Sequence, residues 1–518
     1  MPIRDLNQLA SDPFAGKIYD VCICGAGPAG ITLARKLADI YSVCLLEAGD
    51  RHYTPESQDC YKGEITGEPY FPLDQCRLRY LGGASNHWGG ACRPLDARDF
   101  EKRPFVKYSG WPISRQDLDP YLAEAKEIFD IPADEPEVPS AKGSEWLPPF
   151  RRHEQIEFWL SPQVRFGEKY EGELERTPSI DVYLNANVTD IWLEDNLKTT
   201  KYFEVTDYRG RKFKAHARLF ILATGGLENP RVLLNANHQL PHGIGNEHDL
   251  VGRFFTDHPH QHLGEFLLED DIRAQAQKDP VFMGKALPIK GRFLRPSKEY
   301  MRDARVLSYS LGVRPTFAME REPDTPFKAR LRDILCASEL LRESAEFIKN
   351  GSVSCFDVDG YLKIQSEQEP NPESRIALAA STDRFDLRRM DMQWHRTDLD
   401  RRTIKDAALL VARLFPLSHR GRVRLERWLH EDPLHLPGPY DGTPSIVAGP
   451  HHMCTTRMAD DPREGVVDRW QRVHSNTNLY IAGSSSFATG GFANPTFTIV
   501  QMSLRLADHL KTLRHKLA

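Results

Sequence analysis

The chain has 518 residues, of which 40% are hydrophobic and 27% charged, so it is long enough for two or three globular domains. Its formal net charge of −5 leaves no basic field for a nucleic acid or an anionic membrane. No run approaches the ~20 apolar residues of a membrane helix, and the first residues lack the apolar segment of a signal peptide. Its nine cysteines have neither paired nor zinc-type spacing. We therefore expect a cytoplasmic protein with reduced thiols and with neither nucleic-acid nor membrane partners.

A glycine-rich turn joins an apolar strand to a helix near the N-terminus. The segment "YDVCICGAGPAGITLARKLADIYSVCLLEAGD" predicts strands at 21–24 and 43–46 around a helix. Its G-x-G-x-x-G pattern permits a tight turn, a close approach of pyrophosphate to the backbone, and packing of the helix on the strand. Glu47, at the tip of the second strand, is placed to accept hydrogen bonds from a ribose. The predicted dinucleotide-binding residues are Gly25, Gly27, Pro28, Ala29, Gly30 and Glu47.

Three later segments extend this prediction. "RLFILATGGLENPRVLL" predicts a strand at 220–223 that returns to the same sheet, and "NLYIAGSSSF" predicts another at 479–482 before a Gly/Ser-rich turn. "NANVTDIWLED" offers Val188, whose backbone would meet an adenine, although any strand would give the same weak signal. These segments add Val188, Ala223, Thr224, Gly225, Gly483 and Ser484 to the candidate cofactor-binding residues.

The final helix is predicted to start at the cofactor. Asn494 is a good N-cap residue and Pro495 suits the first helical position, where its missing N–H costs nothing. The free N–H groups at such a helix end, including the N–H of Thr496, and the helix dipole favour binding of an anion. A reduced flavin carries negative charge at one edge of its ring and would be such an anion. An ordinary terminal helix is the alternative. The buried stripe of this helix is predicted to be Ile499, Met502, Leu506 and Leu510.

Six blocks of sequence, in order, resemble the glucose–methanol–choline (GMC) family of flavin oxidoreductases. They are the N-terminal fingerprint, "YLGGASNHWGGACRPLDARDF", "ATGGLENPRVLL", "LVGRFFTDHPH", "EQEPNPESRIALAASTDRFDLRRMDMQW" and the C-terminal "HHMCTTRMADDP…NLYIAGSSSF…ANPTFTI". The blocks look nearest to the branch of pyranose 2-oxidase, fructose dehydrogenase and the bacterial sugar and glycoside dehydrogenases. The resemblance implies FAD as the cofactor.

The same resemblance implies an α/β fold, α+β overall. A Rossmann-like FAD domain of the glutathione-reductase type would accompany a substrate domain with a central antiparallel sheet flanked by helices. The expected FAD domain is discontinuous and comprises residues 1–100, 180–265 and 440–518; the expected substrate domain comprises residues 100–180 and 265–440. Within the latter, alternating segments 351–368 and 374–395 predict antiparallel strands, and the spacing in 325–350 predicts a helix.

The segment "GPHHMCTTRMADDP" around His451 has three interpretations. A metal site is unfavoured because adjacent histidines in an extended segment point to opposite faces. Cys454 as a nucleophile would need a neighbouring base and a lowered pKa, and the family usually has glycine at its position. The third interpretation is a proton acceptor, because oxidation of an alcohol removes a proton from oxygen and a hydride from carbon. Histidine, with an unperturbed pKa of ~6.5, suits this role.

The resemblance assigns the two catalytic positions. The family's catalytic histidine lies four residues before the motif threonine Thr455, which makes it His451. Its second member, which orients the same hydroxyl, falls just before Pro-Thr at Asn494. His452 is then expected to point away as a packed or exposed histidine, and no metal is expected.

The block "GGASNHWGG" poses a separate question about the flavin. His87 matches the position that carries the flavin covalently in pyranose 2-oxidase. The alternative, which we favour, is that Asn86 and His87 line the flavin without a bond, while tight glycine turns press backbone against the ring. The candidate cofactor-binding residues here are Gly82, Gly83, Ser85, Asn86, His87 and Gly89.

The function expected from this reading is FAD-dependent oxidation of an alcohol group to a carbonyl. The substrate would be a sugar, polyol, glycoside or sugar-like natural product, with His451 as the base and flavin N5 as the hydride acceptor. Oxygen, a quinone or a redox protein would then reoxidise the flavin. The alternatives are a non-redox GMC-type flavoprotein (cyanohydrin lyase-like or photodecarboxylase-like), an oxidase of a non-sugar alcohol, and a non-catalytic flavin-binding module.

Overall fold

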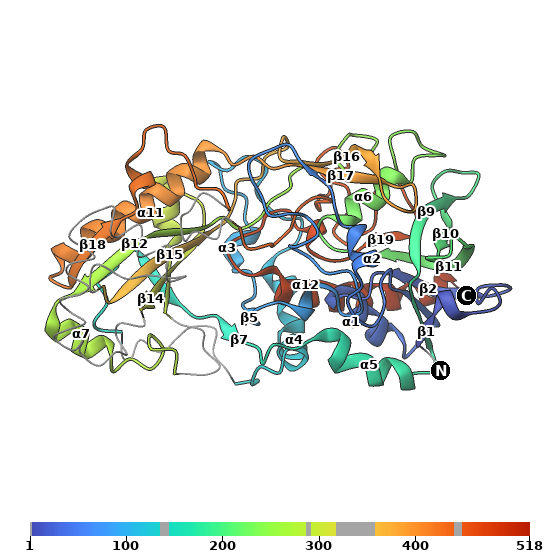
Figure 1. Ribbon diagram of the computed structural model, residues 1–518, viewed down its shortest axis with the longest axis horizontal. Helices are drawn as coiled ribbons and strands as arrows, with labels where there is room; N and C mark the ends of the chain where they lie inside the picture. Colours follow the sequence, from blue (N-terminus) through green and yellow to red (C-terminus); the bar gives the residue numbers. More distant parts are fainter. Residues whose placement is uncertain (1–2, 135–143, 286–291, 317–357, 440–447, 518) are drawn as a thin grey trace.

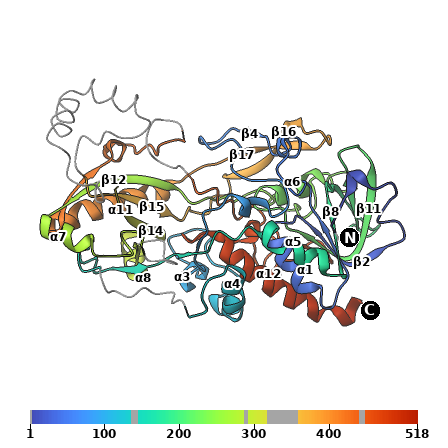
Figure 2. The ribbon, with the colours of Figure 1, turned by 60° about the horizontal axis from the view of Figure 1, so that its bottom comes forward.

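The computed structural model describes residues 3–134, 144–285, 292–316, 358–439 and 448–517. An eight-stranded and a six-stranded sheet stand at opposite ends of an elongated molecule (Figures 1 and 2). Both chain termini lie at the end with the eight-stranded sheet. The other end carries α7 (Asp270–Ala276) and α11 (Asp398–Leu417). The mixed α/β fold expected from the sequence is confirmed.

The eight-stranded sheet has the order β1-β8-β3-β2-β11-β10-β9, and β19 also pairs with β11. Its strands are β1 (Ile3–Asp5), β2 (Ile18–Cys24), β3 (Val43–Leu46), β8 (Ile180–Leu184), β9 (Asn187–Leu193), β10 (Thr200–Thr206), β11 (Lys212–Leu222) and β19 (Leu479–Ile481). β2 runs parallel to β3 and β11, and β11 runs parallel to β19, whereas β9, β10 and β11 form an antiparallel meander. All four strands predicted for this sheet are present. β11 is longer than predicted because its first half pairs with β10 and is only half-buried.

Two helices that are distant in sequence cover this sheet together. α1 (Pro28–Leu37) and α12 (Pro495–Thr512) contribute to one buried cluster with the strands. Of the predicted stripe on α12, Met502, Leu506 and Leu510 are buried, and Ile499 is half-buried because it lines a cavity. α12 therefore completes the core around the first βαβ unit.

The six-stranded sheet is antiparallel throughout, in the order β18-β12-β15-β14-β13-β6. Its strands are β6 (His153–Ile156), β12 (His260–Leu268), β13 (Phe293–Pro296), β14 (Tyr309–Pro315), β15 (Gly360–Ser366) and β18 (Gly421–Leu425). Leu311 and Ile364 pack with Ile404 of α11 on one face. β15 confirms part of the strand predicted within 351–368; the helix predicted at 325–350 and residues 351–357 lie outside the described residues.

The remaining elements connect the two ends. The hairpin of β16 (Arg375–Thr382) and β17 (Arg388–Gln393), predicted within 374–395, pairs with β4 (Glu64–Ile65) and lies beside α6 (Glu228–Asn235) (Figure 1). The other elements are β5 (Ala91–Cys92), β7 (Trp159–Leu160), α2 (Pro55–Asp59), α3 (Ala97–Phe100), α4 (Leu122–Ile128), α5 (Phe166–Arg176), α8 (Lys298–Ala304) and α13 (Arg514–Leu517), with short 3₁₀ turns at Leu6–Gln8, Gly83–Asn86, Arg115–Asp117, Asp119–Tyr121, Arg427–His430 and Ser484–Ser486.

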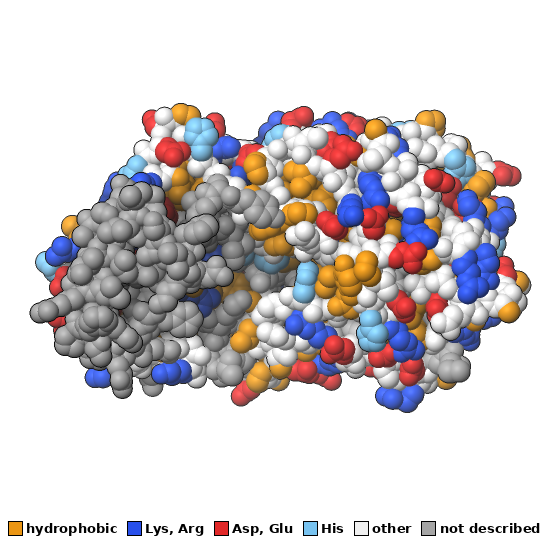
Figure 3. All heavy atoms as spheres, in the orientation of Figure 1, with side chains coloured by type: hydrophobic (Ala, Val, Ile, Leu, Met, Phe, Trp, Pro, Cys, Tyr) orange, Lys and Arg blue, Asp and Glu red, His pale blue; other side chains and the backbone are white. Residues whose placement is uncertain are grey.

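The surface carries mixed charge. On the face in Figure 3, basic and acidic side chains are interspersed over the described residues, without a large patch of one sign. Within the described part of the chain, no helix combines the length and apolarity needed to cross a membrane.

Candidate active site

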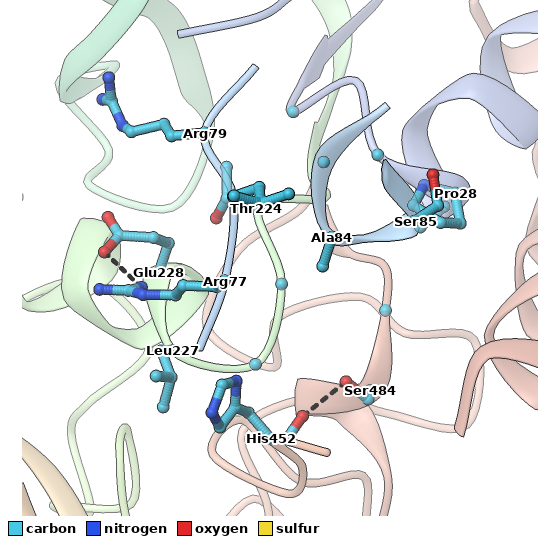
Figure 4. Close-up of a pocket in the computed structure, with 18 of the residues that line it drawn as sticks. Pro28, Arg77, Arg79, Ala84, Ser85, Thr224, Leu227, Glu228, His452 and Ser484 are labelled. Atoms are coloured by element: carbon cyan, nitrogen blue, oxygen red, sulfur yellow. Dashed lines mark hydrogen bonds and ion pairs between the residues drawn. The ribbon is translucent and has the colours of Figure 1, made fainter. Parts of the chain in front are cut away.

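A cavity of about 490 Å³ collects most of the residues that the sequence singled out (Figure 4). This volume lies within the usual range for small-molecule sites. The predicted residues that line it are Gly25, Gly27, Pro28, Ala29, Glu47, Gly83, Ser85, His87, Gly89, Val188, Ala223, Thr224, Gly225, His451, Gly483, Ser484, Asn494, Pro495 and Thr496. Gly30, Gly82 and Asn86 are not among the lining residues and instead support the turns beside it.

The three fingerprint glycines each meet a different steric requirement. Gly25 has φ +104°, and a Cβ there would lie 2.6 Å from the carbonyl oxygen of Ala223. A Cβ on Gly30 would lie 1.8 Å from the carbonyl oxygen of Gly25, so the first turn of α1 packs tightly on the preceding turn. A Cβ on Gly27 would meet nothing within 4 Å, so this face opens into the cavity. The space in front of the helix N-terminus is therefore shaped for a ligand phosphate.

The carboxylate of Glu47 is fixed at the end of β3. One oxygen accepts a hydrogen bond from the backbone N–H of Ala26 and the other from that of Gly49, both at 2.9 Å. Glu47 is only 6% exposed but lines the cavity. Since each carboxylate oxygen can accept a second hydrogen bond, Glu47 can still bind a ribose hydroxyl.

The N-terminus of α12 faces the same cavity through Asn494, Pro495 and Thr496. Asn494 occupies the N-cap position, but the expectation that its side chain caps the helix is wrong. Its Nδ2 donates to the carbonyl oxygen of Ala91 at 3.2 Å, and its Oδ1 accepts from Nε2 of Gln365 at 2.8 Å. Tertiary partners thus replace the local cap and orient the amide, and they tie α12 to the six-stranded sheet.

His87 ends a short turn of consecutive glycines. Gly82 and Gly83 have φ of +93° and +55°, conformations that glycine adopts without strain. Burial, followed by the positive charge of Arg165, lowers the pKa of the His87 imidazole. His87 is therefore a neutral ring at the edge of the cavity near neutral pH.

We expect most of the flavin to be released when the purified protein is denatured by acid or heat, because His87 is predicted to line the ring without bonding to it. Chromatography of the supernatant and the precipitate measures this. Flavin that stays with precipitated wild-type protein, but is freed from a His87→Ala variant, would instead show a covalent bond through this imidazole.

His451 lies in a cluster of histidines beside the cavity. Its Nδ1 is 2.9 Å from Nδ1 of His258, and its ring centroid is 5.8 Å from that of His260. Its backbone N–H donates to Oδ1 of Asp257 at 3.0 Å. Within the described ranges, no group of three or more His, Cys, Asp or Glu side chains is arranged to hold a metal ion.

His452 is packed, as expected, but it does not point away from the site. Its ring packs between Tyr70 and Phe255, and the residue lines the cavity near Leu227 (Figure 4). Its carbonyl oxygen accepts a hydrogen bond from Ser484 Oγ at 2.7 Å. Burial, and then the nearby charge of Arg77, lowers the pKa of His452 to about 3.

The low pKa of His452 predicts a loss of stability in acid. The folded protein keeps this ring neutral, whereas the unfolded chain binds a proton below pH ~6.5, so stability falls as pH falls from about 6.5 towards 3. By linkage, this contribution reaches roughly 2 kcal/mol at pH 5. A His452→Phe variant is expected to lose less stability than wild type between pH 7.5 and pH 5 in chemical denaturation, by about that amount. An equal loss in His452→Phe and in a His52→Asn control, whose side chain is exposed, would refute this assignment.

Cys454 is held in a backbone conformation that favours glycine. Its φ is +69°, which agrees with the glycine usual at this position in the family, so the loop keeps its path despite the side chain. Thr256 Oγ1 donates to its Sγ at 3.2 Å, and burial raises the pKa of the thiol to about 12. A thiol that stays protonated at neutral pH is a poor nucleophile.

Several charged residues that line the cavity were not predicted. Arg77 and Glu228 form a buried ion pair at 2.8 Å, visible in Figure 4. Arg79 donates to Asn187 Oδ1 and to Tyr208 Oη, both at 2.8 Å. The segment "CRLRYLGG" could have indicated them, because two arginines stand shortly before the glycine turn. The buried Asp257 and His258 stand in "FTDHPH", where no local pattern indicates a role for either residue.

Comparison with known proteins finds a matching family model and several similar oxidoreductases. A family model described as GMC oxidoreductase matches residues 370–503. The large subunit of fructose dehydrogenase from Gluconobacter japonicus is 25% identical over 94% of this chain and 97% of its own length. Paromamine 6'-oxidase from Streptomyces fradiae is 24% identical over 95% of this chain and 91% of its own. Residues 370–503 thus match the GMC oxidoreductase family, and the chain as a whole is similar to these two oxidoreductases.

A solved structure shares the fold of this chain. Pyridoxine 4-oxidase from Mesorbium loti superposes with a TM-score of 0.58 at 16% identity, over 95% of this chain and 99% of that chain. The protein uses FAD and oxidises an alcohol group, as expected from the sequence. The cavity fits this cofactor, because the space in front of Gly27 is open and the N-termini of α1 and α12 both face the cavity.

Proposed function

We propose that this enzyme oxidises a hydroxyl group of a sugar, polyol or sugar-like glycoside to a carbonyl, with His451 as the base. The substrate class is supported by relatives whose names specify fructose and paromamine as substrates. The observation that carries the proposal is that His451 and Asn494 line the same cavity as the fingerprint turn around Gly27.

The protein's own groups would prepare the hydroxyl for oxidation. Bound FAD supplies the acceptor for the hydride that leaves carbon. His451, as a neutral imidazole, would accept the hydroxyl proton, since hydride leaves an alkoxide-like carbon more readily. The Asn494 amide, held by Ala91 and Gln365, would orient the same hydroxyl.

The cofactor would bind along the opposite part of the cavity. Gly25, Gly27 and the first turn of α1 would hold the pyrophosphate, Glu47 the ribose, and the backbone near Val188 the adenine. Further contacts with FAD would come from the Thr224–Gly225 and Gly483–Ser484 turns and from Pro495 and Thr496 at the start of α12. The glycine turn at residues 82–89 would contact the flavin ring through Gly83, Ser85, His87 and Gly89, with Gly82 and Asn86 supporting the turn.

The proposal retains the predicted division of the chain, with residues 1–100, 180–265 and 440–518 as the FAD domain and 100–180 and 265–440 as the substrate domain. One refinement concerns the hairpin of β16 and β17, since Phe385 and Leu387 line the cavity beside Arg231 of α6. This hairpin would cover the cofactor.

The electron acceptor would be oxygen, a quinone or a redox protein. A cytoplasmic location would suit Cys22 and Cys44, which face each other on β2 and β3 without a disulfide.

Anaerobic mixing of the purified enzyme with a panel of sugars, polyols and aminocyclitols tests this function. We expect at least one compound to abolish the visible absorbance of the oxidised flavin, and the product to be a carbonyl by mass spectrometry. A His451→Ala variant with a full complement of FAD is the matched control. Flavin that no alcohol of any class reduces would favour the non-redox alternatives, and reduction only by alcohols unlike sugars would refute the substrate class.

A further inference from the structure

A second buried histidine directly contacts the proposed base. Nδ1 of His258 lies 2.9 Å from Nδ1 of His451, and Nε2 of His258 lies 3.4 Å from the carbonyl oxygen of Gly490. The His258 side chain is fully buried. The three groups therefore form a continuous chain from a backbone carbonyl through one imidazole to the next.

The chain has a defined direction of hydrogen bonding. A carbonyl oxygen can only accept, so Nε2 of His258 must carry the proton and donate to Gly490. In a neutral imidazole only one nitrogen is protonated, so Nδ1 of His258 must accept. Its partner, Nδ1 of His451, must then donate, which leaves Nε2 of His451 as the nitrogen that can take up a proton.

We propose that His258 is a positioning residue that fixes His451 in the tautomer with Nδ1 protonated, so that Nε2 is the basic nitrogen. This inference rests on the proposed role of His451 and goes beyond it, because it names the group that prepares the base. When His451 becomes charged, the hydrogen bond from its Nδ1–H to His258 strengthens and stabilises the imidazolium.

The surroundings keep His258 neutral and in place. Burial lowers the pKa of His258 to about 4, and this outweighs the opposing effects of the Gly490 and Gly491 backbone and of Glu367. Glu367 is itself paired with Arg103, with two contacts of 2.6 Å. His258 therefore remains an acceptor at Nδ1 throughout the neutral range.

Asp257 holds the two histidine backbones at the spacing that this hydrogen bond needs. Its Oδ1 accepts from the backbone N–H groups of His258 at 2.6 Å, His451 at 3.0 Å and Gly449 at 3.2 Å. Its other oxygen accepts from Tyr70 Oη. The acid thus joins two segments that are far apart in the sequence and aligns their rings.

Two amide substitutions separate positioning from packing. In a His258→Asn variant the amide oxygen can occupy the place of Nδ1 and accept from His451, whereas a His258→Gln variant places its amide towards Gly490 and removes that acceptor. Reduction of the flavin by an alcohol is expected to be at least about tenfold slower in His258→Gln than in His258→Asn. The pH at which reduction is half-maximal is expected to shift to lower values in His258→Gln and to stay near wild type in His258→Asn, because only the latter stabilises the His451 imidazolium.

Nitrogen NMR of protein labelled with [¹⁵N]histidine measures the tautomer without any substrate, with the His451 signals assigned from a His451→Ala sample. We expect wild-type His451 to show a protonated Nδ1 and an unprotonated Nε2, and the His238→Asn surface control to be unchanged. A His451 ring protonated at Nε2 would overturn the proposal, as would identical pH profiles in both His258 variants. A wild-type enzyme with the expected tautomer but no reduction by alcohols would refute the proposed function alone. If His258→Gln does not fold, the wild-type spectrum still decides.

Discussion

Replacing His451 by alanine is expected to slow reduction of the flavin by an alcohol about 10²–10⁴-fold, the usual contribution of a general base, while FAD stays bound. The physical reason is that the hydride leaves carbon slowly while the hydroxyl keeps its proton. His451 lines the cavity and is anchored through its backbone to Asp257, so the substitution removes the imidazole without moving the loop. Anaerobic stopped-flow absorbance measures the rate.

Two neighbouring variants make this measurement specific. Asn494→Ala should slow flavin reduction less than His451→Ala does, because the amide orients the hydroxyl but does not accept its proton. Its effect on stability should come from the lost contacts with Gln365 and Ala91, since the side chain does not cap α12. His452→Ala should stay within a few-fold of the wild-type rate. If flavin reduction were slow in His452→Ala and nearly normal in His451→Ala, His452 and not His451 would be the base.

Replacing Gly27 by valine is expected to give a folded protein that has lost most of its FAD, at least about tenfold in occupancy, because the side chain would fill the approach to the pyrophosphate. The backbone at Gly27 has φ −86°, which valine tolerates, and a Cβ there meets no protein atom within 4 Å. The damage should therefore fall on the ligand and not on the fold. The flavin absorbance of purified protein and the cofactor released on denaturation give the occupancy.

Two other glycines provide the contrast. Gly30→Val should prevent folding, because even its Cβ would overlap the carbonyl oxygen of Gly25. Gly172→Ala on α5 should leave FAD content unchanged, since its Cβ would contact only the guanidinium end of Arg176. If Gly27→Val retained full FAD, or if wild type released a nicotinamide in place of FAD, the assignment of the fingerprint turn would be wrong.

The amino-acid sequence alone predicted the dinucleotide-binding half of the fold, because the residues that indicate it are adjacent in the chain. A tight turn needs Gly25 and the packing of α1 needs Gly30 whatever the rest of the molecule does, so these requirements are written in adjacent residues. The short apolar runs of β2, β3 and β19 are buried on both faces, and such strands are recognisable from composition. The family pattern added His451 and Asn494 as candidates.

Tertiary structure decided what those candidates contact. The residues around Asn494 predicted that its side chain caps α12, but its amide oxygen accepts a hydrogen bond from Gln365 of β15. The six-stranded sheet supplies this donor, which replaces the backbone N–H groups of the helix. Arg77 and Glu228 pair in the cavity wall from segments that no sequence pattern connects. His258 meets His451 only because the segment that precedes β12 and the 449–452 loop both bind Asp257. Local backbone requirements are encoded by adjacent residues, whereas the partner of a buried polar group depends on which distant segments the fold brings within hydrogen-bonding distance.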